Sequence, residues 1–337
     1  MNIQEYSVAA ITVLESKNQT TIAKEIGVHP STANRFLASD FIKKIDFKPF
    51  INRAFRRKKK LTIVVDEFVV NKRYSENIEG TSYMLDPATK TFATSYRIVT
   101  IGITDGNFFI PINSEQWIAQ WILKDSYKKI TDIAKLLILK LLDLNLNIKN
   151  CVMDGLYFTK EFTNWLCEQK LNFTIKAKTT TSVLYKGEKI QLKNCKDLVL
   201  NNNQSAKTIV AEWNGKIWYF TAMRRMGKRG PKTIYLISNF KTKSKNYTKI
   251  YNARWTIEKC FRTTKQSLGL KDSSSRYANI YLAHIKCVFF AYALLQLIKK
   301  KFKLKSTEEA IRKVQSWNDK YGFKKTVQKA NLLENYA

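Results

Sequence analysis

The segment from Tyr251 to Lys265 narrows most what this chain can fold into. Read as one helix, it places Tyr251, Arg254, Glu258, Arg262 and Lys265 within a stripe roughly 80° wide, because each residue advances by about 100°. One carboxylate is then set among three cations and a phenol. Such a face can hold a divalent metal while its cations bind phosphates. The alternative is an ordinary solvated face with ion pairs between successive turns.

The charge of the chain indicates what it binds. The 337 residues include 59 Lys and Arg against 27 Asp and Glu, a formal charge of +32. Because 45% of the residues are hydrophobic, we expect a folded protein, with more than one domain. A folded chain of this charge repels itself unless a polyanion neutralises it. Nucleic acid is therefore the expected partner.

Histidine and cysteine are too few and too scattered for several kinds of site. The two histidines, His29 and His284, disfavour His-dependent triads and His-rich metal sites. The five separated cysteines predict neither a zinc cluster nor a disulfide framework, which fits a reducing cytoplasm. Metal chemistry would then rest on carboxylates, which favour Mg²⁺ or Mn²⁺.

The chain shows no targeting pattern. The N-terminus has no signal-peptide pattern, so a cytoplasmic location is expected. The most apolar stretch, Ile280 to Ile298, contains His284, Lys286 and Gln296. We interpret it as a buried core helix and expect no membrane partner.

The first 48 residues predict a helical DNA-binding domain. Two short helices, Thr21 to Ile26 and Ser31 to Leu37, flank Gly27 as in a helix-turn-helix. A plain helical hairpin is the alternative. The residues that would point outward and read a DNA groove are Ser31, Thr32, Asn34 and Arg35.

A basic linker, residues 49–60, follows this domain. We expect it to track the phosphate backbone, although a merely solvated charge run is the competing interpretation. Its basic residues are Arg53, Arg56, Arg57, Lys58, Lys59 and Lys60.

Residues 61–177 predict an α/β sheet of mixed direction. A β-branched run at 61–65 ends in Asp66, and strand-like runs follow at 94–104 and 108–112. Helical and strand patterns then alternate, with a strand at 148–153 that ends in Asp154. Residues 246–300 would complete this unit.

Two further segments differ in composition. Residues 178–245 predict a β-rich insertion, with a hairpin tip that would touch DNA through Arg224, Arg225, Lys228 and Arg229. Residues 301–337 are basic and helical, and Ser306 is suited to cap a final helix.

Asp66 and Asp154 each lie where an apolar strand is expected to stop. Ligands gather at such strand ends in open α/β sheets, although a single Asp there is often a turn or cap residue. With Glu258 from a helix, these carboxylates could hold two hard metal ions. Such a pair of ions supports in-line phosphoryl displacement.

These motifs resemble a known family. Tyr251, Arg254, Glu258 and Lys265 match the Tyr-x2-Arg-x3-Glu-x6-Lys signature of the DDE transposases of prokaryotic insertion sequences. The resemblance is to the subgroup with a β-rich insertion in a ribonuclease H-like catalytic domain, and it covers roughly residues 58–300. VVDEF around Asp66 and VMDGLYF around Asp154 look like the family's two aspartate motifs.

The resemblance implies cut-and-paste DNA transposition with two Mg²⁺ or Mn²⁺ ions per active site. Asp66, Asp154 and Glu258 would be the metal ligands, and Tyr251, Arg254 and Lys265 would contact phosphates near the transposon end. The phosphate role of Arg262 rests only on the helical spacing. Members that form a DNA hairpin trap a flipped base on a tryptophan of the preceding strand, where this chain has Tyr235 and no Trp. Tyr235 would stack a base less strongly, or the hairpin step is absent.

The expected partners follow from this resemblance. They are the terminal inverted repeats, target DNA and a second copy of the chain in a synaptic complex, and the location would be the nucleoid of a prokaryotic cytoplasm. Two alternatives stay open, a ribonuclease H-like nuclease or resolvase that cuts without joining, and a DNA-binding relative without catalysis.

Overall fold

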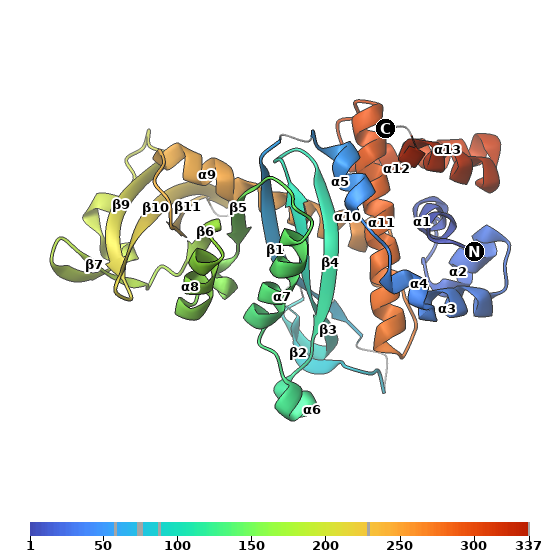
Figure 1. Cartoon of the computed structure of the whole chain (residues 1–337), viewed down its shortest axis with the longest axis horizontal. Helices are drawn as coiled ribbons and strands as arrows, with labels where there is room; N and C mark the ends of the chain where they lie inside the picture. Colours follow the sequence, from blue (N-terminus) through green and yellow to red (C-terminus); the bar gives the residue numbers. More distant parts are fainter. Residues whose placement is uncertain (57–58, 73–76, 87–88, 228–229, 336–337) are drawn as a thin grey trace.

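The computed structural model describes residues 1–56, 59–72, 77–86, 89–227 and 230–335 (Figure 1). Eleven strands of the described residues form one sheet, in the order β2-β3-β1-β5-β6-β11-β10-β9-β7-β8, with β4 paired to β3. The strands are β1 (Leu61–Asn71), β2 (Ser82–Asp86), β3 (Thr91–Thr104), β4 (Phe109–Trp117), β5 (Ile148–Met153), β6 (Asn172–Ala177), β7 (Ser182–Tyr185), β8 (Glu188–Gln191), β9 (Ala206–Trp213), β10 (Lys216–Gly227) and β11 (Gly230–Ser238).

The helices lie along both faces of this sheet and beyond it. The α-helices are α1 (Ile3–Thr12), α2 (Gln19–Ile26), α3 (Pro30–Ala38), α4 (Asp40–Lys43), α5 (Lys48–Ala54), α6 (Gln120–Leu123), α7 (Ile130–Leu142), α8 (Lys160–Glu168), α9 (Ser244–Asn252), α10 (Trp255–Ser267), α11 (Ala278–Lys301), α12 (Thr307–Tyr321) and α13 (Phe323–Asn335). Short 3₁₀ turns are η1 (Lys124–Ser126), η2 (Gly155–Tyr157), η3 (Leu192–Asn194) and η4 (Lys196–Leu198).

The centre of the sheet has the mixed direction that the sequence predicts. β1 is antiparallel to β3, and β3 is antiparallel to β4, whereas β1, β5 and β6 run parallel. Ile63, Val64 and Val65 of β1 are fully buried, as expected for a strand covered on both faces. The predicted α/β class is therefore confirmed.

The segment 178–245 is rich in strands and continues the same sheet. β11 pairs antiparallel with β6, and β10 and β9 follow in turn (Figure 1). The last strand of this segment is thus hydrogen-bonded directly to a central strand. The pairing fixes the position of the segment along β6, because Leu236 of β11 lies opposite Lys176 of β6.

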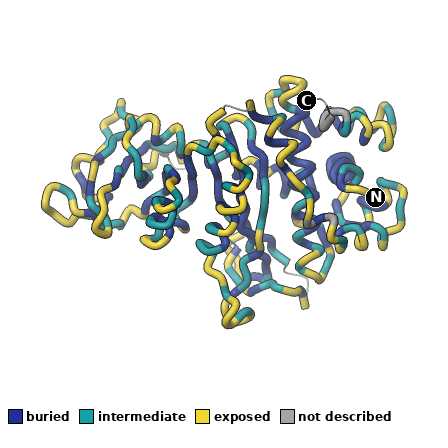
Figure 2. Tube along the Cα trace, in the orientation of Figure 1, coloured by how far each residue is buried: buried dark blue, intermediate teal, exposed yellow. Residues whose placement is uncertain are grey.

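The long apolar helix α11 is the central helix of the molecule. α7 packs on β3 and β4 from one side, whereas α11 packs on β4 from the other (Figure 1). Within the described residues, α11 is the one helix that is long and apolar enough to cross a membrane, yet 83% of its apolar window is buried in the protein. Figure 2 shows it as a largely buried tube. The predicted buried core helix is confirmed.

The N-terminal helices pack on the side of α11 away from the sheet (Figure 1). α2 ends at Gly27, whose φ of 81° is a left-handed conformation that glycine adopts readily, and α3 begins at Pro30. The two helices that the sequence predicts here are present. The first half of the predicted basic linker is also helical, as α5.

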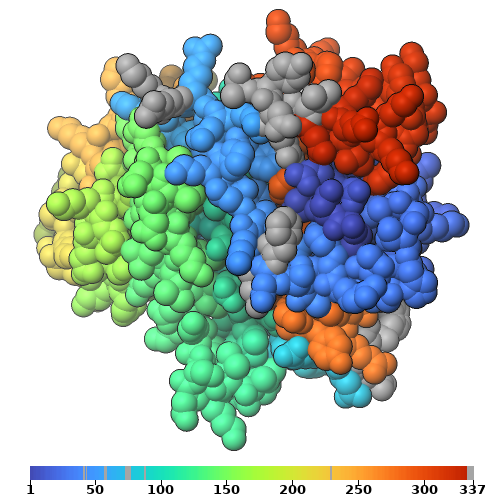
Figure 3. Space-filling view, turned by 45° about the vertical axis from the view of Figure 1, so that its right-hand side comes forward, coloured from blue at the N-terminus to red at the C-terminus, as the bar shows by residue number. Residues whose placement is uncertain are grey.

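Both ends of the chain contribute to one surface. α1 packs against α12 and α13, and Figure 3 shows the N-terminal and C-terminal residues side by side. Ser306 caps α12 through its hydroxyl, which accepts from the Glu309 N–H, as predicted. The single final helix that the sequence suggests is in fact two, because the chain turns at Gly322 with a φ of 75°.

Candidate active site around Arg254

The signature segment is two helices rather than one. α9 ends at Asn252 and α10 begins at Trp255. Around the junction the N–H groups of Ala253, Arg254 and Ile257 donate to the carbonyl three residues earlier, as in a 3₁₀ turn. The prediction of one continuous helix is therefore wrong. Residues 253 and 254 keep helical backbone angles, but their hydrogen bonds follow the 3₁₀ pattern, which separates α9 from α10.

Asp66 does not end its strand. β1 continues to Asn71, with Phe68, Val69 and Val70 buried beyond Asp66, so the predicted strand end at Asp66 is wrong. Asp154 does follow β5 directly, as predicted. The two acids still lie at the same level of neighbouring strands, since Val65 of β1 is paired with Met153 of the parallel strand β5.

The same register brings a lysine to this edge. Met153 is paired with Ile175 of β6, so Asp66, Asp154 and Lys176 follow at one level of three parallel strands. The Lys176 Nζ lies 3.5 Å from the Asp154 Oδ1. A basic group therefore faces the second aspartate from the neighbouring strand.

Arg254 joins the remaining two acids. Its Nη1 donates to the Asp66 Oδ2 at 2.7 Å, and its Nη2 donates to the Glu258 Oε1. The side chain of Arg254 is 9% exposed and that of Asp66 is 12% exposed. The described structure thus gathers all three predicted acids, with Asp66 and Glu258 around one guanidinium and Asp154 beside them.

Burial sets the electrostatics of this cluster. It raises the pKa of Asp66 to about 7, although the charge of Arg254 counteracts the shift. Burial also raises the pKa of Glu67, which accepts a hydrogen bond from the Tyr157 hydroxyl at 3.3 Å. A further cation would therefore be bound favourably beside Asp66, because it would stabilise the ionised carboxylate.

The three carboxylates suit a hard divalent cation, but basic side chains of the protein already pair with them. Carboxylate oxygens of Asp66, Asp154 and Glu258 are the ligands that Mg²⁺ and Mn²⁺ prefer. Among the residues that the structure describes, no three His, Cys, Asp or Glu side chains form a ready metal-binding group. In chemical type the three acids fit a divalent metal, which would have to replace the guanidinium of Arg254.

The other signature residues border the cluster. Tyr251 is buried, and the Arg254 Cζ lies 5.9 Å from the centre of its ring. Lys265 donates to the Val69 carbonyl at 3.3 Å, and burial lowers its pKa to about 8. Arg262 is exposed on α10, outside this buried cluster.

A comparison with protein families finds a matching family model. Residues 127–294 match the family model of the transposase DDE domain. Over this span the chain is similar to a transposase DDE domain. The matched span includes Asp154 and Glu258 and begins after Asp66. No curated protein matches the chain.

The mixed α/β structure is consistent with a ribonuclease H-like transposase domain. The two antiparallel strands β3 and β4 lie beyond β1 on one side, and the parallel strands β5 and β6 lie on the other. Asp66 on β1 and Asp154 directly after β5 lie at the junction of these two halves.

The predicted DNA-binding residues of the insertion have different surroundings. The guanidinium of Arg224 donates to the carbonyls of Leu200, Asn201 and Asn202, so it braces a loop. The Arg225 guanidinium lies 4.1 Å from the centre of the Trp255 ring. Lys228 and Arg229 lie outside the described residues.

Tyr235 is a core residue of the sheet. Only 8% of it is exposed, and it lies in β11 between Ala177 of β6 and Ala222 of β10. Burial raises the pKa of its hydroxyl. With so little of the residue exposed, a base could stack on this ring only if the side chains that cover it moved.

The predicted groove-reading residues lie together on α3. Ser31, Asn34 and Arg35 are exposed, whereas Thr32 is half-buried. Ala33 and Leu37 on the opposite face are buried, which orients the exposed residues outward. Their DNA-binding role stays a prediction.

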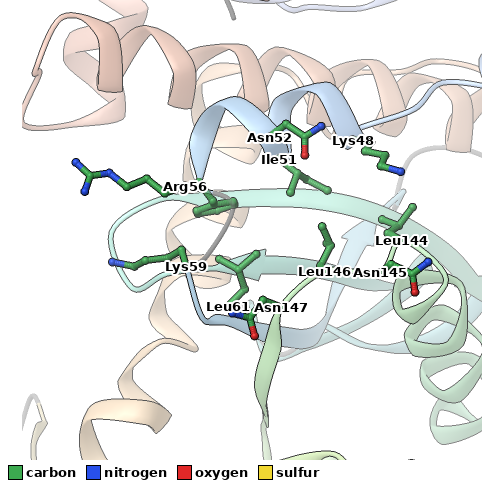
Figure 4. A pocket seen from close by; sticks show the side chains of 11 residues that line it. Lys48, Ile51, Asn52, Arg56, Lys59, Leu61, Leu144, Asn145, Leu146 and Asn147 are labelled. Carbon is green, nitrogen blue, oxygen red and sulfur yellow. The ribbon is translucent and has the colours of Figure 1, made fainter.

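The basic linker lines a pocket of about 540 Å³ at the other end of β1 (Figure 4). Lys48, Arg56 and Lys59 lie around it, and Figure 4 shows the loop after α7 on its opposite side. Lys59 also pairs with Asp105, with 3.6 Å between the Nζ and the Oδ2. Arg57 and Lys58 of the predicted basic run lie outside the described residues.

Sequence reasoning missed four residues near the acids, namely Glu67, Tyr157, Lys176 and Trp255. Glu67 and Tyr157 lie within the two aspartate motifs, close in sequence to Asp66 and Asp154. Lys176 could be found only from the register of β5 and β6, which no local pattern gives.

Proposed function

We propose that this protein is a cut-and-paste DNA transposase that cleaves the ends of its element and joins them to target DNA. Two observations carry the proposal: Asp66 and Glu258 share Arg254, with Asp154 directly after the neighbouring strand, and residues 127–294 are similar to a transposase DDE domain. A net charge of +32 supports a polyanionic substrate.

Asp66, Asp154 and Glu258 would hold two Mg²⁺ or Mn²⁺ ions. When bound, these ions would activate a water or 3′-hydroxyl and stabilise the leaving oxygen of a phosphodiester. The burial of Asp66 serves this role, because a partly desolvated carboxylate attracts cations more strongly than a solvated one. Glu258 is more exposed, at 28% of its side chain, so DNA would reach it more readily than Asp66.

The neighbouring cations would position DNA. Arg254 and Lys265 would bind phosphates near the cleaved bond, and the phenol of Tyr251 would pack beside them. Arg225 on the Trp255 ring adds a cation from the β10–β11 hairpin. These groups lie on three elements, so DNA bound there would link the insertion to the α9–α10 junction.

DNA contacts would extend beyond the acids. Ser31, Asn34 and Arg35 on α3 would read a groove, and the basic pocket would bind the backbone. Joining two ends requires two active sites, so we propose a homodimer assembled on DNA. The C-terminal helices are one candidate contact, although α12 already packs on α1 and α11.

The test uses purified protein, Mg²⁺ and DNA that contains the gene with its natural flanks. We expect cleavage at the element ends and covalent joining of those ends to a second plasmid. Cleavage without joined products would favour a nuclease or resolvase. Binding without cleavage in either Mg²⁺ or Mn²⁺ would favour a non-catalytic DNA-binding protein.

A further inference from the structure

The chain's own cations occupy all three acids. Arg254 pairs with both Asp66 and Glu258, and Lys176 pairs with Asp154. A divalent metal needs the same carboxylate oxygens. It can therefore bind only by competing with a guanidinium that already pairs with two of the three ligands.

The two pairs differ in strength. Arg254 is 9% exposed and lies 2.7 Å from Asp66, so water and salt screen this contact little. Lys176 is 41% exposed, Asp154 is 35% exposed, and their atoms are 3.5 Å apart. An exposed lysine pair of this kind contributes little. The main obstacle to a metal is therefore Arg254.

A phosphate can take over the guanidinium. Arginine binds phosphate and carboxylate with the same pair of parallel N–H groups, so either anion satisfies it. Arg254 stands at the junction of α9 and α10, beside Tyr251 and within the same cluster as Lys265. DNA held by these neighbours would present phosphates to this arginine.

We infer that Arg254 keeps divalent metal away from Asp66 and Glu258 until a DNA phosphate draws its guanidinium off them. The inference rests on the proposed function, because it assumes that these acids bind metal. It adds an order, with DNA first and metal second. The two ligands must then strengthen each other by the same factor, as linkage requires.

The first measurement is calorimetric titration of Mn²⁺ into the DNA-free protein. Arg254→Gln removes the competing charge, and we expect it to bind Mn²⁺ about tenfold more tightly than wild type. Lys176→Gln is the matched control, since it also removes one cation next to an acid. We expect it to change the affinity by less than about threefold.

The second measurement is the coupling between Mn²⁺ and a DNA duplex without the element ends, which is bound but not a cleavage substrate. In wild type, the duplex should tighten Mn²⁺ binding about tenfold, after subtraction of Mn²⁺ bound by DNA alone. In Arg254→Gln the factor by which the duplex tightens Mn²⁺ binding should fall toward one. Arg254→Lys should restore part of it, because a lysine keeps the charge but cannot bridge both acids.

The outcomes separate the inference from the proposed function. Equal Mn²⁺ affinity of wild type and Arg254→Gln, or equal coupling in both, would overturn the inference. If Glu258→Gln and Asp66→Asn also leave Mn²⁺ affinity unchanged, the metal site itself fails. Should Arg254→Gln not fold, as judged by its thermal melt, the comparison of wild type with Arg254→Lys decides in the same way.

Discussion

Two buried polar clusters in this molecule satisfy their polar groups in different ways. In the first, the His284 Nε2 lies 2.8 Å from the Gly269 carbonyl, and its Nδ1 lies 2.8 Å from the Tyr6 hydroxyl. A carbonyl only accepts, so Nε2 donates and Nδ1 accepts from Tyr6. In the second, the guanidinium of Arg254 forms ion pairs with both Asp66 and Glu258.

The difference lies in whether the partners can be exchanged. Tyr6 and His284 are fully buried, neutral and satisfied within the protein, so any change there costs stability. They tie α1 to α11. The charged cluster reaches the surface at Glu258, and each of its partners can be replaced by a metal or a phosphate. The first cluster holds the fold, and the second is suited to function.

The largest effect should follow removal of the acids. Asp66→Asn, Asp154→Asn and Glu258→Gln should each lower DNA cleavage by about 10³-fold, because each would remove a metal ligand at the reacting phosphate. DNA affinity should change little. The measurement is single-turnover cleavage, with Glu188→Gln in the exposed strand β8 as the control. Comparable losses in the control would refute a special role for the three acids.

Acid should weaken the neutral cluster. Burial lowers the pKa of His284 to about 4 from 6.5, so below pH 6.5 the unfolded chain takes up a proton that the folded protein does not. The contribution of His284 to the free energy of unfolding is fully present above pH 6.5. It falls by roughly 3 kcal/mol as the pH drops to 4. Denaturant unfolding from pH 8 to 4 measures this loss.

His284→Gln provides the comparison for that pH series. It cannot titrate, so it should lose less stability than wild type over the same pH range. Parallel curves for the two proteins would show that another group causes the acid sensitivity.

The basic pocket offers a smaller effect on binding alone. Lys48→Ala, Arg56→Ala and Lys59→Ala combined should weaken DNA binding about tenfold and reduce the salt dependence by about 2.7 log units per log unit of salt, if each contacts a phosphate. The matched control removes Lys189, Lys193 and Lys196, which are also exposed. Equal losses in both triple variants would mean that only net charge matters.

The smallest effect should come from one hydroxyl of the neutral cluster. Tyr6→Phe should lower the free energy of unfolding by about 1 kcal/mol, since it leaves the Nδ1 of His284 without its donor. Tyr83→Phe is the control, because Tyr83 is 67% exposed. DNA cleavage should not change in either variant. A loss of cleavage in Tyr6→Phe would contradict the separation of the two clusters.

The sequence predicts the parts of the site that depend on local pattern. Asp154 follows an apolar strand as expected, and Arg254 and Glu258 share a face despite the break before α10. The continuation of β1 past Asp66 escaped prediction because Glu67 interrupts the apolar run. Lys176 and the buried position of Tyr235 depend on pairing between distant strands, which local patterns do not encode.

The count of Mn²⁺ ions bound in the protein–DNA complex tests the central claim most directly. With DNA that carries the element ends, wild type should bind two ions per protein beyond those held by the DNA alone, and Glu258→Gln should bind fewer. A wild-type complex that binds no Mn²⁺ beyond the DNA background would contradict a metal site at Asp66, Asp154 and Glu258.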